Sequence, residues 1–251
     1  MGVVVRSIIV LVLCTLSCGA QASRGFGTTF GAGTTDIVQS GYSTVAATNF
    51  TYGSWIWVNG AGGGSLGKLF IRQANSSNEA IGFNGVLATM KLTTAWSGGG
   101  QFHWTTPSSN AWHNLCITYN NSSSANVPVV YIDGVSVSVT TDATPSGTYT
   151  PSATAMYIGN AASAVRVWDG KLAEIAYWNG SLLTANECKA FALGMSPLKL
   201  HGGPSLYLPL YGYQSNEQDW GPSHVTQTIT GTVGRNHAPV QTYPLEGIER
   251  Q

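Results

Sequence analysis

Short β-type runs separated by turn residues are the sequence feature that most constrains this fold. Runs rich in Val, Ile, Thr, Tyr and Trp alternate with Gly, Asn, Asp or Pro along most of the chain. Turn signals recur about every ten residues, which is typical of antiparallel strands in a sandwich or barrel. The clearest runs are GSWIWVNG (53–60), KLFIRQ (68–73), NLCITYN (114–120), VPVVYIDG (127–134) and LAEIAYWNG (172–180). We therefore expect an all-β fold of antiparallel strands.

Two local motifs predict a hairpin and a helix. Asp133-Gly134 joins VVYI to VSVSV, and both residue types accept the positive φ of a type I′ turn. Thr184 and Glu187 have the spacing of a capping box at the start of a helix over 185–193. Because this helix is short and isolated, it does not suit a series of β-α-β units. We expect it to lie across a sheet as a lid.

The segment NGAGGGSLGKLF (59–70) contains fragments of two active-site motifs. Residues 62–68 fit the phosphate-binding pattern G-x-x-x-x-G-K, but Leu69 stands where Ser or Thr would hold magnesium. Residues 63–67 fit the nucleophile elbow G-x-S-x-G of serine hydrolases. Both motifs need a helix after the loop, whereas KLFIRQ is short and reads as a strand. We interpret Ala61–Gly67 as the glycine-rich loop of a hairpin and both matches as coincidence.

Length and charge restrict the class of partner. The 251 residues suit one domain, and the 11 Lys and Arg residues balance the 11 Asp and Glu residues. Charged residues make up 9% of the chain, against about 25% in a typical soluble domain. Because there is no basic excess and no Lys/Arg run, we expect no nucleic-acid binding. A surface of Ser, Thr, Asn and Gly suits an extracellular protein.

The N-terminal segment has the pattern of a secretory signal. Arg6 precedes a short apolar stretch, and Ala20-Gln21-Ala22 fits a cleavage site. We expect a signal peptide over 1–22, one domain over 23–238 and a C-terminal tail over 239–251. A lipid anchor at Cys18 is the alternative. No later segment has eighteen consecutive apolar residues, so we expect no transmembrane segment.

Removal of the signal peptide leaves two cysteines, Cys116 and Cys188. In an oxidising compartment they can form a disulfide, and otherwise they are two buried free thiols. We favour the thiols, because Cys188 occupies an apolar position of the predicted helix, where Leu183 before the cap can pack against it. Two cysteines at this separation have no zinc-ligand spacing.

Four segments, in order, resemble those of one known family. AWHNLCITYN (111–120) is similar to the W-H-x-V-A-V-T-Y strand of laminin-G-like domains in the concanavalin A-like lectin/glucanase superfamily. VVYIDGVSVSV (129–139), residues 156–191 and DWGPSHVTQTITGTV (219–233) resemble its Y-I-D-G hairpin, its I-A-E-V-x-I-W-N segment and its closing strand. The resemblance extends over about residues 25–239. It implies a jelly-roll sandwich of two curved antiparallel sheets.

The resemblance also raises an enzymatic alternative, a glycoside hydrolase. Hydrolytic members carry their acids as E-x-D-x-(x)-E, and a retaining pair of carboxyl groups stands about 5–5.5 Å apart. The nearest match here is Glu217-Gln218-Asp219, which lacks a third acid and precedes turn residues. Asp169, Glu174 and His113 fall at framework positions of the family. A Ser-His-Asp set leaves no pattern of spacing, and nothing in the sequence points to one. We therefore expect no catalytic residue.

Aromatic residues in polar surroundings are the candidates for binding a ligand. Trp96, Trp104 and Tyr149 lie in segments rich in Gly, Ser and Thr. An exposed ring can stack on the apolar face of a sugar while neighbouring amides bond its hydroxyls. The tryptophans expected in the core, because they match framework strands, are Trp55, Trp57, Trp112, Trp168 and Trp178.

Calcium is a further ligand that the resemblance implies. Many laminin-G-like domains hold one ion at a loop rim, and calcium takes carboxylate, amide and carbonyl oxygens. Asp36, Asp142 and Asn160 have the required donor type, although they form no compact run.

Three functions are consistent with the sequence. The first, which we favour, is a secreted non-catalytic module that recognises a glycan, a glycosylated surface or a protein surface. The second is a structural or adhesive protein, such as a virion component or cell-surface appendage, with no small ligand. The third is the glycoside hydrolase, which the missing acids disfavour. The sequence does not predict an oligomeric state.

Overall fold

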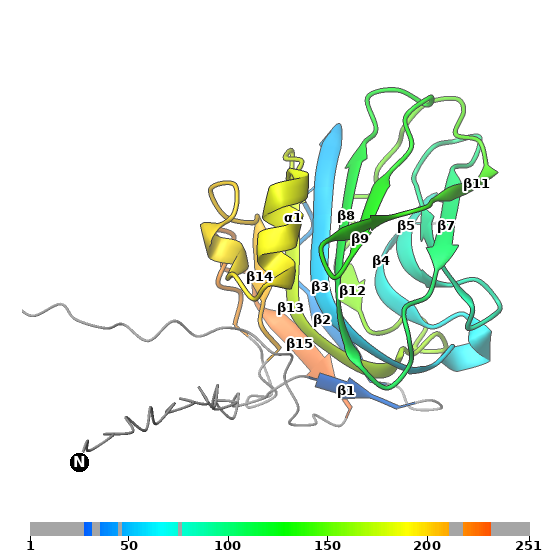
Figure 1. Cartoon of the computed structure of the whole chain (residues 1–251). Coiled ribbons are helices and arrows are strands. Elements are labelled where there is room, and N and C mark those ends of the chain that lie inside the picture. Colours follow the sequence, from blue (N-terminus) through cyan, green and yellow to red (C-terminus); the bar gives the residue numbers. More distant parts are fainter. Residues whose placement is uncertain (1–27, 32–35, 45–46, 75–76, 211–217, 232–251) are drawn as a thin grey trace, which may run out of the picture.

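The computed structural model describes residues 28–31, 36–44, 47–74, 77–210 and 218–231. The expected signal peptide and C-terminal tail lie outside the described residues, as does Cys18. Two antiparallel sheets face one another, and one helix covers the outer side of one of them (Figure 1). The expected jelly-roll sandwich of antiparallel strands is confirmed.

The first sheet has seven strands in the described residues, in the order β1-β13-β3-β8-β9-β10, with β14 also pairing with β13. Their bounds are β1 Thr28–Phe30, β3 Asn49–Gly60, β8 Trp112–Asn120, β9 Val129–Ile132, β10 Val135–Val137, β13 Asp169–Asn179 and β14 Leu206–Leu208. The long strands β3, β8 and β13 form its centre.

The second sheet has eight strands, in the order β11-β7-β6-β5-β4-β12-β2-β15. Their bounds are β2 Ile37–Ser40, β4 Lys68–Ala74, β5 Ser77–Phe83, β6 Thr89–Thr93, β7 Gln101–Thr105, β11 Thr140–Ala143, β12 Met156–Ile158 and β15 Gln227–Thr230. The closing strand β15 pairs with β2, so the C-terminal part of the chain returns to the sandwich as expected.

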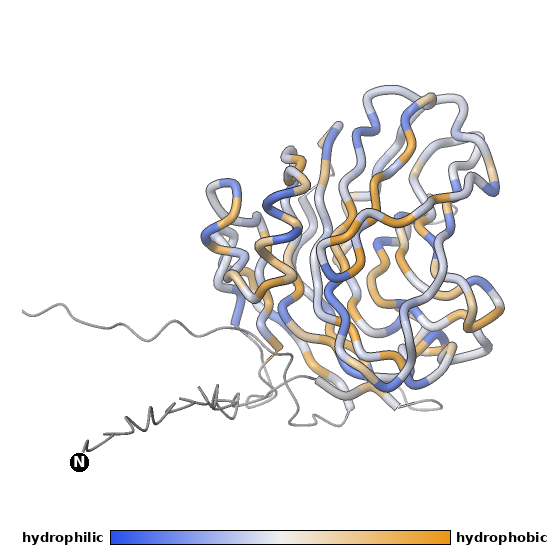
Figure 2. Tube along the Cα trace, in the orientation of Figure 1, coloured by the Kyte–Doolittle hydropathy of each residue, from blue (hydrophilic) through white to orange (hydrophobic). Residues whose placement is uncertain are grey.

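Alternation along β3 separates two hydrophobic cores. Ile56 and Val58 are fully buried in the main core between the sheets, whereas Trp55 faces the other side and packs beneath the helix. Successive residues of a strand point to opposite faces, so one run serves both layers. Figure 2 shows hydrophobic residues along the strands of both sheets and hydrophilic residues mainly at the turns.

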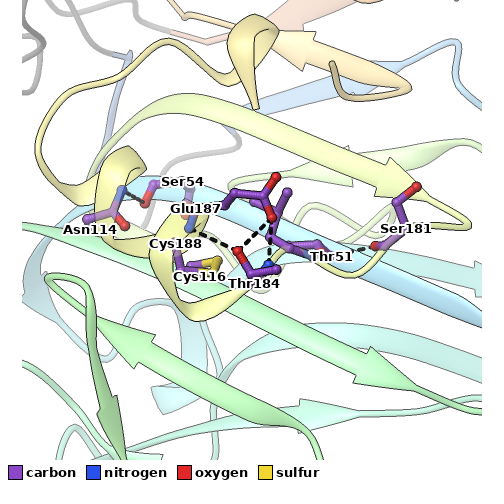
Figure 3. The surroundings of a disulfide bond; sticks show 9 residues. Thr51, Ser54, Asn114, Cys116, Ser181, Thr184, Glu187 and Cys188 are labelled. Atoms are coloured by element: carbon purple, nitrogen blue, oxygen red, sulfur yellow. Dashed lines mark hydrogen bonds between the residues drawn. A yellow bond between two sulfur atoms is a disulfide. The ribbon is translucent and has the colours of Figure 1, made fainter. Parts of the chain in front are cut away.

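The helix α1, Ala185–Ala192, lies across the seven-stranded sheet as predicted. Glu187 N donates to Thr184 Oγ1 at 3.3 Å and Thr184 N donates to Glu187 Oε2 at 2.7 Å, which completes the capping box (Figure 3). Cys188 and Phe191 are buried against the sheet. A disulfide joins Cys188 to Cys116 on β8, so the favoured interpretation of two free thiols is wrong (Figure 3).

The loop Ala61–Gly67 differs from its expectation. We expected a hairpin, but β3 belongs to the seven-stranded sheet and β4 to the eight-stranded sheet, so the loop crosses between layers. It contains a single 3-10 turn, η1 Gly63–Ser65, and then enters β4. Glycine-rich turn chemistry is the same for a hairpin and a crossover, so composition did not decide between them. Because a strand follows, neither the phosphate-loop nor the nucleophile-elbow context is present.

The hairpin between β9 and β10 forms where the sequence placed it. Asp133 has φ of 52° and Gly134 has φ of 76°, as a type I′ turn requires. A second 3-10 turn, η2 Pro197–Lys199, follows the helix.

Candidate functional site

Trp96 and Tyr149, two of the three predicted ligand-binding aromatic residues, lie together. Their ring centroids are 5.5 Å apart and their planes meet at 66°. The two segments that carry them pair with one another, since Ser97 N donates to Thr148 O at 2.9 Å and Thr150 N to Ala95 O at 2.8 Å. The segments are about fifty residues apart in sequence, yet backbone hydrogen bonds hold both rings in one arrangement.

Each ring of the pair is also held through its polar atom. Trp96 Nε1 donates to Tyr119 Oη at 3.0 Å, and Tyr149 Oη donates to Glu79 Oε1. Burial raises the pKa of the Glu79 carboxyl, and the Tyr149 hydroxyl acts against that rise. Burial, and then the charge of Glu79, raise the pKa of the Tyr149 hydroxyl far above 10. Tyr149 therefore stays a hydrogen-bond donor at physiological pH.

A buried ion pair lies behind Tyr149. Arg72 Nη1 and Glu79 Oε2 are 3.9 Å apart, and their side chains are 0% and 4% exposed. Arg72 Nη2 donates to the carbonyl of Thr44, and the guanidinium lies 5.7 Å from the ring centroid of Tyr42. The pair belongs to β4 and β5, where Arg72 and Glu79 are register partners. A fixed charged layer thus supports the aromatic pair.

The surface around the two rings is rich in hydroxyl groups. Ser97, Ser146 and Thr148 are exposed, while Trp96 and Tyr149 are partly exposed. The Ser97 hydroxyl accepts from Thr148 N at 3.0 Å. This arrangement offers a rigid apolar surface bordered by groups that donate and accept hydrogen bonds, which is what a polyhydroxylated ligand needs.

Trp104, the third predicted aromatic residue, is buried in the main core at 1% exposure. The prediction of an exposed ring is wrong for this residue. Trp104 lies two residues after Phe102 on β7, and both therefore point toward the opposite sheet. The polar residues around it in sequence occupy the outer face of the same strand.

The three predicted metal ligands do not form one site. Asn160 Nδ2 donates to the carbonyl of Asp36 at 3.1 Å, but the Asn160 Oδ1 already accepts from Ala161 N and Arg166 N, each at 2.8 Å. Asp142 lies on β11, at the end of the eight-stranded sheet away from β2. Within the described residues, no three His, Cys, Asp or Glu side chains gather in a way that could hold a metal ion. The fold therefore does not bring the three candidate ligands together.

The acidic residues considered for hydrolysis have structural partners. Asp219 is buried, and its carboxylate accepts from the backbone N–H groups of Tyr207, Gly221 and Val225 at 3.0, 2.8 and 3.1 Å. Glu174 is buried and accepts a hydrogen bond from the Tyr207 hydroxyl. Glu217 lies outside the described residues. Asp219 therefore fastens the returning C-terminal segment to β14.

His113 bridges a serine and an aspartate, which the sequence did not indicate. Its Nε2 is 2.8 Å from Ser108 Oγ and its Nδ1 is 2.7 Å from Asp133 Oδ2, the order of contacts in a nucleophilic triad. However, the Asp133 side chain is 50% exposed, whereas a triad aspartate is buried. Its other oxygen accepts from Asn114 N at 2.8 Å. The chain of contacts joins the β7–β8 loop to the hairpin turn, which agrees with the expected framework role of His113.

A second pair of partly exposed tryptophans went unrecognised. Trp57 and Trp112 were expected in the core, but both are only partly buried on the outer face of the seven-stranded sheet. Their centroids are 5.9 Å apart, and Lys171 Nζ lies 4.3 Å from the ring centroid of Trp57. The alternation of β3 places Trp57 on the face of Trp55, but the cluster beneath α1 includes only Trp55 and not Trp57. Lys171 on β13 and Trp112 on β8 thus flank Trp57 on the two strands that neighbour β3.

Comparison with known proteins identifies the fold family. Residues 32–188 match a family model described as the concanavalin A-like lectin/glucanases superfamily. A protein from Bacteroides ovatus ATCC 8483, described as carbohydrate-binding, has a similar structure, with a TM-score of 0.62 and 20% identity. The alignment covers 86% of this chain and 61% of that one, so the present chain spans less than two thirds of its neighbour.

Two further solved structures are more distant. The native heptameric SAP-like pentraxin of Limulus polyphemus has a TM-score of 0.49 and 14% identity, over 67% of this chain and 82% of that one. Domains LG4-5 of the mouse laminin α1 chain have a TM-score of 0.43 and 16% identity, over 61% of this chain and 40% of that one. No curated protein matches the chain. In the part of the chain that the structure describes, no helix has the length and apolar character to cross a membrane.

Proposed function

The chain belongs to the concanavalin A-like lectin/glucanase superfamily, and from this premise we propose that it is a secreted, non-catalytic module that binds carbohydrate through Trp96 and Tyr149. The likeness to the B. ovatus protein supports a binding module of this fold. The expected segment 1–22 supports secretion. The predicted candidates Trp96 and Tyr149, rather than Trp104, are the aromatic residues available to a ligand at this site.

The observation that carries the proposal is the fixed aromatic pair. A ring that is already immobilised loses little conformational freedom when a ligand stacks on it, so more of the contact energy appears as affinity. Both polar atoms of the pair are occupied by Tyr119 and Glu79. The exposed parts of the two rings would then make apolar contact with a sugar, and the neighbouring Ser and Thr hydroxyls would form hydrogen bonds to sugar hydroxyls.

The experiment is a glycan-array screen of the purified full chain, followed by calorimetry with the best glycan. Trp96→Ala should weaken binding by at least about tenfold, since aromatic residues at the centre of a site commonly contribute more than about 1.4 kcal/mol. Trp220→Ala is the matched control, because Trp220 is 48% exposed and lies outside the pair. Circular dichroism of both variants checks that the fold is retained.

The screen is run with calcium and with EDTA. Equal binding in both buffers supports recognition by the aromatic pair alone. Loss of binding in EDTA would place an ion in the site and contradict the cofactor-free form of the proposal. An unchanged affinity in Trp96→Ala would refute the assignment of the site. If no glycan binds and the protein forms a defined oligomer in light scattering, a structural or adhesive role replaces the proposed one.

A further inference from the structure

Four residues lie side by side on the outer face of the eight-stranded sheet. Lys68 on β4 is the register partner of Gly82 on β5. Gly82 also pairs with Lys91 on β6, and Lys91 pairs in turn with His103 on β7. Side chains of paired residues on neighbouring strands project from the same face. The opposite face of these strands is the main core, to which they contribute Phe70, Ile81, Phe83, Met90, Leu92, Phe102 and Trp104. Lys68, Lys91 and His103 therefore form a basic row directed away from the core.

Gly82 allows the two lysines of this row to approach. A Cβ at Gly82 would lie 3.0 Å from Lys68 Cδ and 3.1 Å from Lys68 Cα, so the lysine stem passes over the glycine toward β6. The same Cβ would lie 2.3 Å from the carbonyl oxygen of Gly67. Glycine is thus required at this position for the row to exist.

Arg166 adds a third cationic side chain next to the two lysines of the row. It belongs to the connection between β12 and β13, and its carbonyl accepts from Lys68 N at 2.8 Å. Burial, then the charge of Arg166 and that of Lys91, lower the pKa of the Lys68 ammonium to about 8. The two cations therefore lie close enough to Lys68 to repel its charge.

One carboxylate faces the row, and it is already shared. Asp142 Oδ1 is 2.5 Å from His103 Nδ1, and its Oδ2 is 3.9 Å from Lys91 Nζ. Lys91 Nζ also donates to Gln101 Oε1 at 2.7 Å. Among the described residues, neither Lys68 nor Arg166 forms an ion pair. The row thus has an excess of positive charge in a chain with few charged residues.

We propose that Lys68, Lys91 and Arg166 form a site for an anionic group, a carboxylate or sulfate carried by an acidic saccharide. A bound anion between these side chains relieves their mutual repulsion and pairs the two cations that have no acidic partner. The saccharide part of this inference rests on the proposed function, whereas the anion site does not. Lys91 lies in the middle of β6, five residues before Trp96, or about 16 Å along an extended chain. It is therefore separate from the aromatic pair.

The experiment measures binding of trigalacturonate, of its fully methyl-esterified form and of sodium sulfate to the full chain by calorimetry at pH 7. We expect the acidic trisaccharide to bind and its neutral ester to bind at least about tenfold more weakly. Lys68→Met should weaken binding of the acid by at least tenfold, while Lys199→Met, which changes an exposed lysine on η2, should not. Sodium sulfate binding that Lys68→Met abolishes would support the site with a free anion as its source.

Nuclear magnetic resonance of the Lys68 ammonium gives a second readout that does not depend on a variant folding. A bound anion should raise the pKa of Lys68 from its low value. The site is refuted if neither trigalacturonate nor sulfate binds, or if acid and ester bind alike. An unchanged affinity in Lys68→Met would also overturn it. The two proposals fail separately, since Trp96→Ala should leave sulfate binding intact and Lys68→Met should leave neutral-glycan binding intact.

Discussion

Reduction of the disulfide between Cys116 and Cys188 should lower the free energy of unfolding substantially. The disulfide closes a loop with a sequence separation of 72 residues. Restricting the unfolded chain in this way contributes about 4 kcal/mol at 25 °C in the chain-entropy model, between about 3 for a 15-residue loop and about 4.7 for a 100-residue loop. A typical domain is stable by about 5–15 kcal/mol, so this loss is a substantial share of the total.

The perturbation has two forms that separate the cross-link from the packing. Reduction of the wild-type protein removes only the bond, whereas Cys116→Ala/Cys188→Ala also deletes two sulfur atoms that are fully buried. The double variant should lose about 1–2 kcal/mol more than the reduced protein, because the vacated volume has to be filled or left empty. The helix α1 has eight residues and is too short to be stable alone, so it depends on this bond and on the cluster beneath it.

The assay is unfolding in guanidinium chloride followed by tryptophan fluorescence. Trp178 reports on the cluster under the helix, because its ring centroid is 6.5 Å from that of Phe191. Reduction should lower the midpoint and raise the slope, since the unfolded chain becomes less compact. Mass spectrometry of a non-reduced digest should find the two cysteine peptides linked. Equal midpoints in oxidised and reduced protein, or two free thiols in the digest, would restore the interpretation of buried thiols.

Two further predictions concern the basic row. Gly82→Ala should destabilise the protein by about 1–3 kcal/mol, measured by thermal unfolding, because the new methyl group would lie 2.3 Å from the carbonyl oxygen of Gly67; an unchanged Tm contradicts this. Lys68 has a pKa of about 8 in the folded protein, against an ordinary value of 10.5. Between these pH values the unfolded chain binds more protons than the folded one, so the free energy of unfolding should rise with pH in that window. In urea unfolding between pH 7.5 and 9.5, the free energy of unfolding should rise more steeply with pH in wild type than in Lys68→Met. Identical pH dependence in the two proteins would contradict the lowered pKa of Lys68. The charged and titratable groups that face Lys68 are Arg166, Lys91, His103 and Asp142.

The parts of the fold that the sequence predicted are those governed by neighbouring residues. Asp133-Gly134 accepts positive φ by its own chemistry, and the capping box of Thr184 and Glu187 closes within one turn. The partner of a strand is a different question, because it depends on residues far away in the chain. The loop after β3 looked like a hairpin for this reason, and its crossing to the other sheet left no local trace. The strand β11 was missed as well, since Thr140–Ala143 is polar and lies at a sheet edge.

Trp96 and Tyr149 are partly exposed as predicted, whereas the errors at the other candidate residues have separate causes. Trp96 and Trp104 lie in the same polar stretch, but Trp104 is on an inward position of β7 and Trp96 in the segment after β6. Polarity of neighbours in sequence does not tell which face a strand residue occupies, because alternate residues are separated by the whole sheet. Asp36 and Asp142 were grouped by donor type alone, and the fold places them at opposite ends of a sheet. The disulfide needed the contact between α1 and β8, which only the tertiary structure provides.

The buried ion pair of Arg72 and Glu79 lies next to the aromatic pair, and its effect on stability differs from its effect on the candidate site. Only 9% of this chain is charged, yet two opposite charges are placed where their side chains are 0% and 4% exposed. Desolvating both ions costs about as much as their attraction returns, so such a pair is weak evidence for stability. Its consequence at the candidate site is geometric, because Glu79 accepts the hydrogen bond of the Tyr149 hydroxyl and the Tyr149 ring contacts that of Trp96. An apolar residue in place of Glu79 would leave the Tyr149 hydroxyl without this acceptor, while Trp96 would keep its hydrogen bond to Tyr119.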